Sequence, residues 1–338
     1  MDSAAGRNLK YVTAPESEAL LDAVARQAVS DRAGIFGPGS ASWKVNREAA
    51  VFLGAGRAAL LQLAHPWVAA ALAEHSTVMD RPMARFHNTF RIVFTMVFGS
   101  LDQALGAARY LYGLHTRIGG ELTEDVAGWR RGMHYEANEV SALRWVYATL
   151  VESAVLAYES ALGPLGETER QRYFAESRTL AGLFGIPAEA LPKDWAGLVA
   201  YMEQMYPSDE LGVSASARGM AQNLLAGAGS WIHPPQWYGA LTAGWLPERL
   251  RTEFGLEFGA EERHAAERGA RWFSAVYRKL PAALRYTGPW HEACARLEGR
   301  WAGIAARVGN RFWIGEWRMP FGEESVLRRD AGETTIAE

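Results

Sequence analysis

Cysteine is almost absent from this chain of 338 residues, in which Cys294 is the only one. A single cysteine excludes a disulfide within the chain, and it excludes zinc and iron–sulfur sites built from several thiolates. Cys294 itself lies in the charged segment HEACARLEGR. That setting makes it a poor candidate for a metal-binding thiolate.

Long hydrophobic runs and a charge imbalance are also lacking. Lys and Arg number 35 and Asp and Glu 38, for a net charge of −3, and the two signs are interspersed. Nothing predicts a nucleic-acid partner. The most apolar segment, 86–98, includes His87, Asn88, Thr89 and Arg91, and is too short and too polar to cross a bilayer. Because the N-terminus has no apolar signal region, we expect a soluble cytoplasmic protein.

Several catalytic motifs are missing as well. The sequence has neither H-E-x-x-H nor G-x-S-x-G. A carboxylate-bridged di-iron bundle requires two Glu-x-x-His elements, and only Glu261–His264 fits that spacing, in a highly charged segment. Gly54-Ala55-Gly56 follows no predicted strand, so it does not indicate a phosphate loop. These absences count against zinc-protease, serine-hydrolase, di-iron and nucleotide-binding chemistry.

Helical periodicity dominates what is present. Apolar residues recur at steps of three and four in the segment 138–162, as they do in much of the chain, and strict alternation is nearly absent. We predict an all-α fold, a single multi-helix bundle. Its expected divisions are an N-terminal helical arm over 1–34, an all-helical domain over 35–310 and a C-terminal tail over 311–338.

The segment 84–120 carries the most specific pattern. Arg85 and Thr89 are four residues apart, so a helix places both on one face. A second predicted helix, 101–118, follows, and Gly119-Gly120 is expected to end it. His115 lies on its apolar side. A cation, a hydroxyl and a lone imidazole bordered by hydrocarbon suit a buried metal cofactor with anionic groups, for which haem is the obvious candidate.

Each of these residues also has a structural interpretation. A buried His115 could bond a backbone carbonyl, and Arg85 could form an ion pair with Asp80 or Glu74. His65 precedes Pro66 at a break between two apolar helices, and Glu74 ends the second of them. His65 and Glu74 are candidates for a distal acid or base, but a helix cap and a solvated carboxylate explain them equally well.

Four runs, taken in order, resemble one known family. They are AGRAALLQLAHPWVAAALAEHS, RFHNT, VFG…LHTRIGG and EANEVSALRWVYATLVES, and KLPAALRYTGPW is similar to the family's end. The family contains the bacterial rubber oxygenases, or latex-clearing proteins, and the fungal oxygenase of mycophenolic acid biosynthesis. The resemblance implies a globin-like helical core with non-covalently bound haem b. The absence of a C-x-x-C-H segment agrees with non-covalent binding.

The resemblance also implies roles for individual residues. His115, in the LHTR element, matches the proximal iron ligand, and Arg85 and Thr89 match the family's Arg-x-x-x-Thr pair near the haem. Asn88 stands where rubber oxygenases have a lysine, and Tyr147 where many relatives have a histidine. Both differences count against polyisoprene as substrate. We therefore expect Arg85, Thr89 and Asn88 near the cofactor, with His65 or Glu74 moving protons.

The expected function is that of a haem b-dependent oxidoreductase. Its most direct form is an oxygenase that acts with dioxygen on a small apolar substrate, whether isoprenoid, lipid or aromatic. Three alternatives remain open at this stage. They are a haem-binding gas sensor or carrier without turnover, a hydroperoxide-using haem enzyme, and a cofactor-free helical binding protein.

Overall fold

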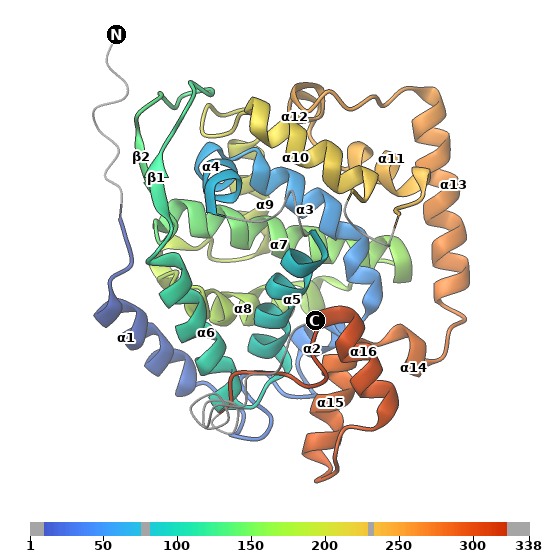
Figure 1. The fold of residues 1–338 in the computed structure, drawn as a ribbon. Helices are drawn as coiled ribbons and strands as arrows, with labels where there is room; N and C mark the ends of the chain where they lie inside the picture. Colours follow the sequence, from blue (N-terminus) through green and yellow to red (C-terminus); the bar gives the residue numbers. More distant parts are fainter. Residues whose placement is uncertain (1–9, 76–81, 229–232, 323–338) are drawn as a thin grey trace.

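The described part of the chain is almost entirely helical (Figure 1). The computed structural model describes residues 10–75, 82–228 and 233–322. Within these ranges it has sixteen α-helices and one small antiparallel sheet, in which β1 (Gly119–Glu121) pairs with β2 (His134–Glu136). The predicted all-α class is confirmed.

The first half of the chain forms a series of short and medium helices around one long one. Their bounds are α1 Ala14–Ala25, α2 Ala41–Asn46, the 3-10 helix η1 Ala49–Gly54, α3 Ala55–Leu63, α4 Pro66–His75, α5 Pro82–Phe98, α6 Leu101–His115 and α7 Val140–Leu162. The second half continues in the same manner. Its helices are α8 Glu167–Leu183, η2 Ala188–Ala190, α9 Trp195–Met205, α10 Ala215–Ala226, α11 Gln236–Gly244, α12 Glu248–Glu253, α13 Ala260–Tyr277, α14 Ala282–Arg285, α15 Gly288–Leu297 and α16 Ile304–Ile314.

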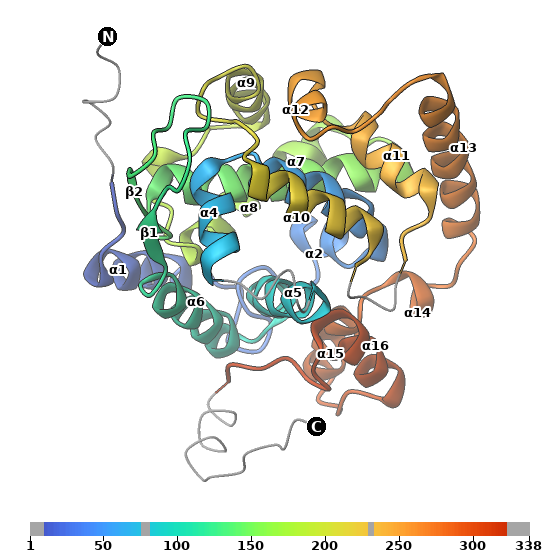
Figure 2. The same ribbon diagram turned by 45° about the horizontal axis from the view of Figure 1, so that its top comes forward.

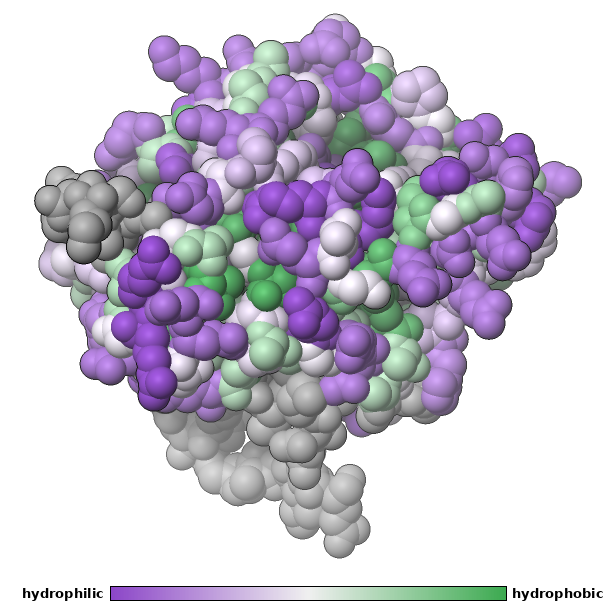
Figure 3. Space-filling model, turned by 90° about the horizontal axis from the view of Figure 1, so that it is seen from above, coloured by the Kyte–Doolittle hydropathy of each residue, from purple (hydrophilic) through white to green (hydrophobic). Residues whose placement is uncertain are grey.

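The long helix α7 is the centre of the core and crosses the middle of the molecule in Figure 1. Its side chains join those of α3, α8, α9 and α10 in one large apolar cluster. By length and composition α7 could cross a membrane, but 61% of its most apolar stretch is buried inside the protein. Burial by its own neighbours explains the apolar composition of this helix. Hydrophilic side chains cover most of the face seen in Figure 3, with small hydrophobic areas between them.

A second apolar cluster surrounds the α5–α6 hairpin. It joins side chains of α1, α5, α6, α15 and α16. Ser100 starts α6 by accepting a hydrogen bond from the Gln103 amide, and the Gln103 side chain accepts one from the Ser100 amide in return. This reciprocal cap fixes where α6 begins, directly after α5 ends.

The structure departs from the sequence-based prediction at the end of α6. The helix predicted over 101–118 ends at His115, and Gly119-Gly120, predicted to end that helix, form most of β1 instead. Tyr135 and Glu136 supply backbone pairing for these glycines, and the sheet therefore replaces the expected helix end. The predicted domain limits stay predictions; α16 runs across the limit proposed at residue 310.

Candidate cofactor site

His115 is the last residue of α6, directly before the chain turns toward β1. The residue as a whole is half-buried. Desolvation lowers the pKa of His115 from 6.5 to about 4, and a hydrogen bond with the Asn138 side chain opposes part of that shift. Because this bond favours the protonated ring, the imidazole donates and the amide oxygen accepts. At neutral pH His115 is therefore uncharged, the form in which histidine binds metals.

Asn138 holds that ring from a well-fixed position between β2 and α7. The residue is 6% exposed. Its backbone carbonyl accepts a hydrogen bond from the Val12 amide at 3.0 Å, and the neighbouring Val140 amide donates to the Lys10 carbonyl at 2.9 Å. The N-terminal segment is thus paired to the backbone at Asn138 itself and at Val140, two residues later. Sequence analysis missed this residue, because an asparagine before a helix ordinarily indicates only a cap.

The predicted Arg-x-x-x-Thr pair lies on α5. Thr89 is half-buried, and the side chain of Arg85 lies outside the described residues. Only Gly99 and Ser100 separate α5 from α6, and the two helices contact each other and lie as neighbours in Figures 1 and 2. The structure therefore brings the helix of Thr89 beside the helix of His115.

Asn88 points elsewhere. Its side chain is exposed, and its amide oxygen accepts a hydrogen bond from Arg91. Arg91 also pairs with Glu316, beyond α16, at 2.7 Å. In this structure Asn88 helps to hold the C-terminal region against α5, and its predicted contact with a cofactor stays a prediction.

His65 lies at the predicted break between α3 and α4. It is 1% exposed, and its ring lies 6.3 Å from the Trp67 ring and 5.6 Å from the Trp129 ring, measured between centroids. The two tryptophans belong to a small apolar cluster beneath the β1–β2 hairpin. His65 is therefore an interior histidine enclosed by indole rings.

Glu74 is at the opposite end of α4 and is exposed to solvent. Its carboxylate accepts a hydrogen bond from the Tyr135 hydroxyl at 2.7 Å and lies 3.9 Å from the His75 ring nitrogen. Glu74 is nine residues after His65, which corresponds to a rise of about 14 Å along the axis of α4. The structure does not bring His65 and Glu74 together as an acid–base pair.

Tyr147, the residue that stands where many relatives have a histidine, lies on α7. It is 2% exposed, and its hydroxyl bonds the Ser177 hydroxyl at 2.7 Å. Burial raises the pKa of Tyr147. The tyrosine therefore links α7 to α8 as an uncharged core residue.

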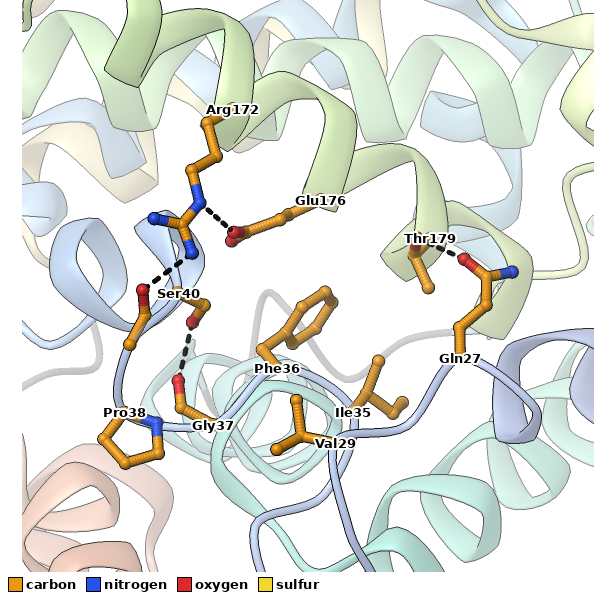
Figure 4. Close-up of a pocket in the computed structure, with 11 residues that line it drawn as sticks. Gln27, Val29, Ile35, Phe36, Gly37, Pro38, Ser40, Arg172, Glu176 and Thr179 are labelled. Carbon is orange, nitrogen blue, oxygen red and sulfur yellow. Dashed lines mark hydrogen bonds and ion pairs between the residues drawn. The ribbon is translucent and has the colours of Figure 1, made fainter.

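A pocket of about 380 Å³ lies in another part of the molecule, between the loop after α1 and helix α8 (Figure 4). Arg172 borders it, donating to the Gly39 carbonyl at 2.8 Å and pairing with Glu176 at 3.1 Å. None of the predicted site residues lines this pocket.

The donor set around His115 fits a metal that brings most of its own ligands. Among the residues that the structure describes, no three His, Cys, Asp or Glu side chains converge as a metal site would require. A porphyrin supplies four ligands to its iron and needs one imidazole from the protein. His115 offers one ring nitrogen for that purpose while Asn138 engages the ring, the usual arrangement around a metal-binding histidine.

Comparisons with known proteins agree with the motif order. Residues 43–279 match the family model described as ER-bound oxygenase mpaB/B′/rubber oxygenase, catalytic domain. No curated protein and no solved structure matches the chain. The matched range contains His65, Glu74, the α5–α6 hairpin and Asn138.

Proposed function

The chain belongs to the family of mpaB and rubber oxygenase catalytic domains, and from this premise we propose that it is a haem b-dependent oxygenase. Membership supports an oxygenase as the class of enzyme. The cofactor, the substrate and the residue roles are the parts that we add. We propose dioxygen as the oxidant and an apolar isoprenoid, lipid or aromatic compound as the substrate.

The observation that carries the haem assignment is the state of His115. Burial keeps its pKa near 4, so the imidazole is neutral and retains its lone pair at physiological pH. Its hydrogen bond to Asn138 fixes the orientation of the ring and increases its basicity as a ligand. Haem, when bound, supplies an iron whose redox chemistry lets dioxygen react with an organic substrate.

The other residues have supporting roles in this proposal. Thr89 would donate its hydroxyl hydrogen, and Arg85 its guanidinium N–H groups, to the anionic groups of the cofactor. Proton transfer falls to His65 or to Glu74, and their separation along α4 means that they act singly. His65 is buried beside two indole rings, whereas Glu74 is exposed to solvent.

The substrate class follows from what is missing at Asn88 and Tyr147. Neither side chain supplies the charge or the imidazole that relatives have at these positions. We therefore propose that the substrate is an apolar molecule small enough to enter the protein, and not a solid extracellular polymer. We also propose that the protein is located in the cytoplasm.

Oxygen uptake by the purified protein tests this function. We expect dioxygen consumption with at least one member of a panel of isoprenoids, fatty acids and alkyl aromatics, and incorporation of label from ¹⁸O₂ into the product. A red protein that binds carbon monoxide but consumes no dioxygen with any of these compounds would favour the sensor or carrier. Turnover with hydrogen peroxide alone would favour the hydroperoxide-using enzyme.

A further inference from the structure

Helix α16 presents hydrophobic side chains to solvent along one face. Ile304, Val308 and Phe312, at four-residue steps, are 79%, 55% and 40% exposed. Residues four apart lie one above the other on a helix, so the three form a continuous stripe. The opposite face of α16 is the one that packs on the protein, through Ala306, Asn310 and Ile314.

Two exposed tryptophans adjoin α16, one before its first turn and one in the segment after its last turn. Trp301 is 77% exposed and Trp317 is 51% exposed. The Arg318 guanidinium lies 4.8 Å from the Trp301 ring centroid, and the Arg307 guanidinium lies 5.8 Å from that of Trp317. We call the five apolar residues together the α16 surface; they are Trp301, Ile304, Val308, Phe312 and Trp317.

The α16 surface is rigidly mounted. The Phe312 carbonyl hydrogen-bonds the His87 ring at 3.0 Å, which ties α16 to α5. Glu292 of α15 accepts hydrogen bonds from the Asn310 side chain and from the Met319 amide, the latter at 3.0 Å. The exposed stripe is therefore part of the fold, and α16 lies at the edge of the molecule, where nothing in the described chain covers it (Figures 1 and 2).

The charge around the stripe differs in sign from that of the whole chain. Residues 298–318 contain four arginines and two glutamates, for a net charge of +2, whereas the chain carries −3. Both glutamates are paired, Glu298 with Arg300 and Glu316 with Arg91. Basic residues beside an exposed apolar helix with flanking tryptophans are typical of segments that lie in the interface of anionic membranes.

We propose that the α16 surface docks the protein on an anionic lipid membrane, with α16 parallel to the bilayer plane. A second copy of the chain is a poorer partner, because symmetric pairing would bring two sets of arginines together. The chain after Gly322, EESVLRRDAGETTIAE, is largely polar and offers little apolar surface to cover the stripe. Docking would bring an apolar substrate close to α5 but does not depend on the haem proposal.

Vesicle flotation of the full-length protein tests the docking. We expect it to float with phosphatidylcholine vesicles that contain phosphatidylserine, and much less with phosphatidylcholine alone. Added salt should weaken binding, because the attraction to the headgroups is screened. The double variant I304S/V308S should bind these vesicles at least roughly ten-fold more weakly than the unaltered protein, because both substitutions remove apolar area from the α16 surface. Each arginine near the surface accounts for about a five-fold change, so R307Q/R318Q should lose roughly thirty-fold.

The control is V29S, which removes an apolar side chain with 61% exposure from a loop outside this surface. It should float like the unaltered protein, and all variants should keep the same helical circular dichroism. Several results would overturn the proposal: no flotation with phosphatidylserine vesicles, equal flotation of I304S/V308S, or equal binding to neutral vesicles. A lipid-free dimer that I304S/V308S dissociates would assign the surface to a second copy. Binding only after removal of the residues beyond Gly322 would assign it to that segment.

Discussion

Replacing Arg57 with Met is expected to lower the free energy of unfolding by about 3 kcal/mol or more. Arg57 is 4% exposed and lies on α3. Its guanidinium donates to the Glu152 carboxylate at 2.6 Å and to the Tyr206 hydroxyl at 2.7 Å. It also donates to the Ser153 hydroxyl at 2.8 Å and to the Trp245 carbonyl at 2.9 Å. One side chain therefore ties α3 to α7 and to residues beyond α9 and α11.

The magnitude depends on what the substitution leaves behind. Methionine keeps much of the side-chain volume but donates no hydrogen bond. Glu152, whose side chain is 19% exposed, would keep one hydrogen bond, from the Tyr206 hydroxyl at 2.7 Å. Removing one partner of a buried ion pair costs about 3–5 kcal/mol, and partial access of water to Glu152 places the expectation at the lower end. The double variant R57M/E152L should recover part of the loss, because no buried charge remains.

Urea unfolding followed by circular dichroism measures both effects. The matched control is R109Q, which breaks the bidentate pair between Arg109 and Glu18, whose side chains are 51% and 52% exposed. An exposed pair contributes about 1 kcal/mol or less, so R109Q should change little. The reasoning is refuted if R57M and R109Q lower the free energy of unfolding by the same small amount. It is also refuted if the effects of R57M and E152L on that free energy simply add in the double variant.

Three further predictions concern the candidate site and its supports. N138L should leave the fold intact but speed the loss of haem several-fold, measured by transfer to apomyoglobin, because the His115 ring loses its acceptor; unchanged transfer would contradict the assignment. In cofactor-free protein, His115 has a pKa near 4 when folded and near 6.5 when unfolded, so the unfolded chain gains protons first as the pH falls. Between pH 8 and pH 5 the free energy of unfolding of the unaltered protein should therefore fall by about 2 kcal/mol more than that of H115Q. An equal fall for both proteins in urea titrations would refute this prediction. A Cβ at Gly54 would lie 2.4 Å from the Ser153 carbonyl oxygen. The variant G54A should therefore lower the free energy of unfolding by about 1–3 kcal/mol in the same urea assay. A neutral effect would show instead that η1 can move away from Ser153.

The sequence was sufficient for the fold class and for placing His115 on a helix. Steps of three and four in apolar residues are local signals, and helices that pack on a shared core preserve them. The single imidazole on an apolar helix face was visible for the same reason. Nothing local, in contrast, could connect His115 with Asn138, which lies beyond the β1–β2 hairpin and meets the ring only when the chain folds back.

One local pattern gave the wrong detail. Gly119-Gly120 has the composition of a helix end, yet its backbone pairs with β2, since an available strand partner outweighs a local preference. The partner of Glu74 could not be predicted from neighbouring residues. Tyr135, which donates a hydrogen bond to the Glu74 carboxylate, is distant in sequence and reaches it only in the folded chain.

The haem content of purified protein tests the central claim most directly. Pyridine haemochromagen spectra of the unaltered protein, H115A and the control H134A should be compared after expression with added haem precursor. His134 is a suitable control because its side chain is 59% exposed. The account predicts roughly one haem b per chain in the unaltered protein and in H134A, and a large loss in H115A. Equal haem in H115A, or none in the unaltered protein, would contradict it.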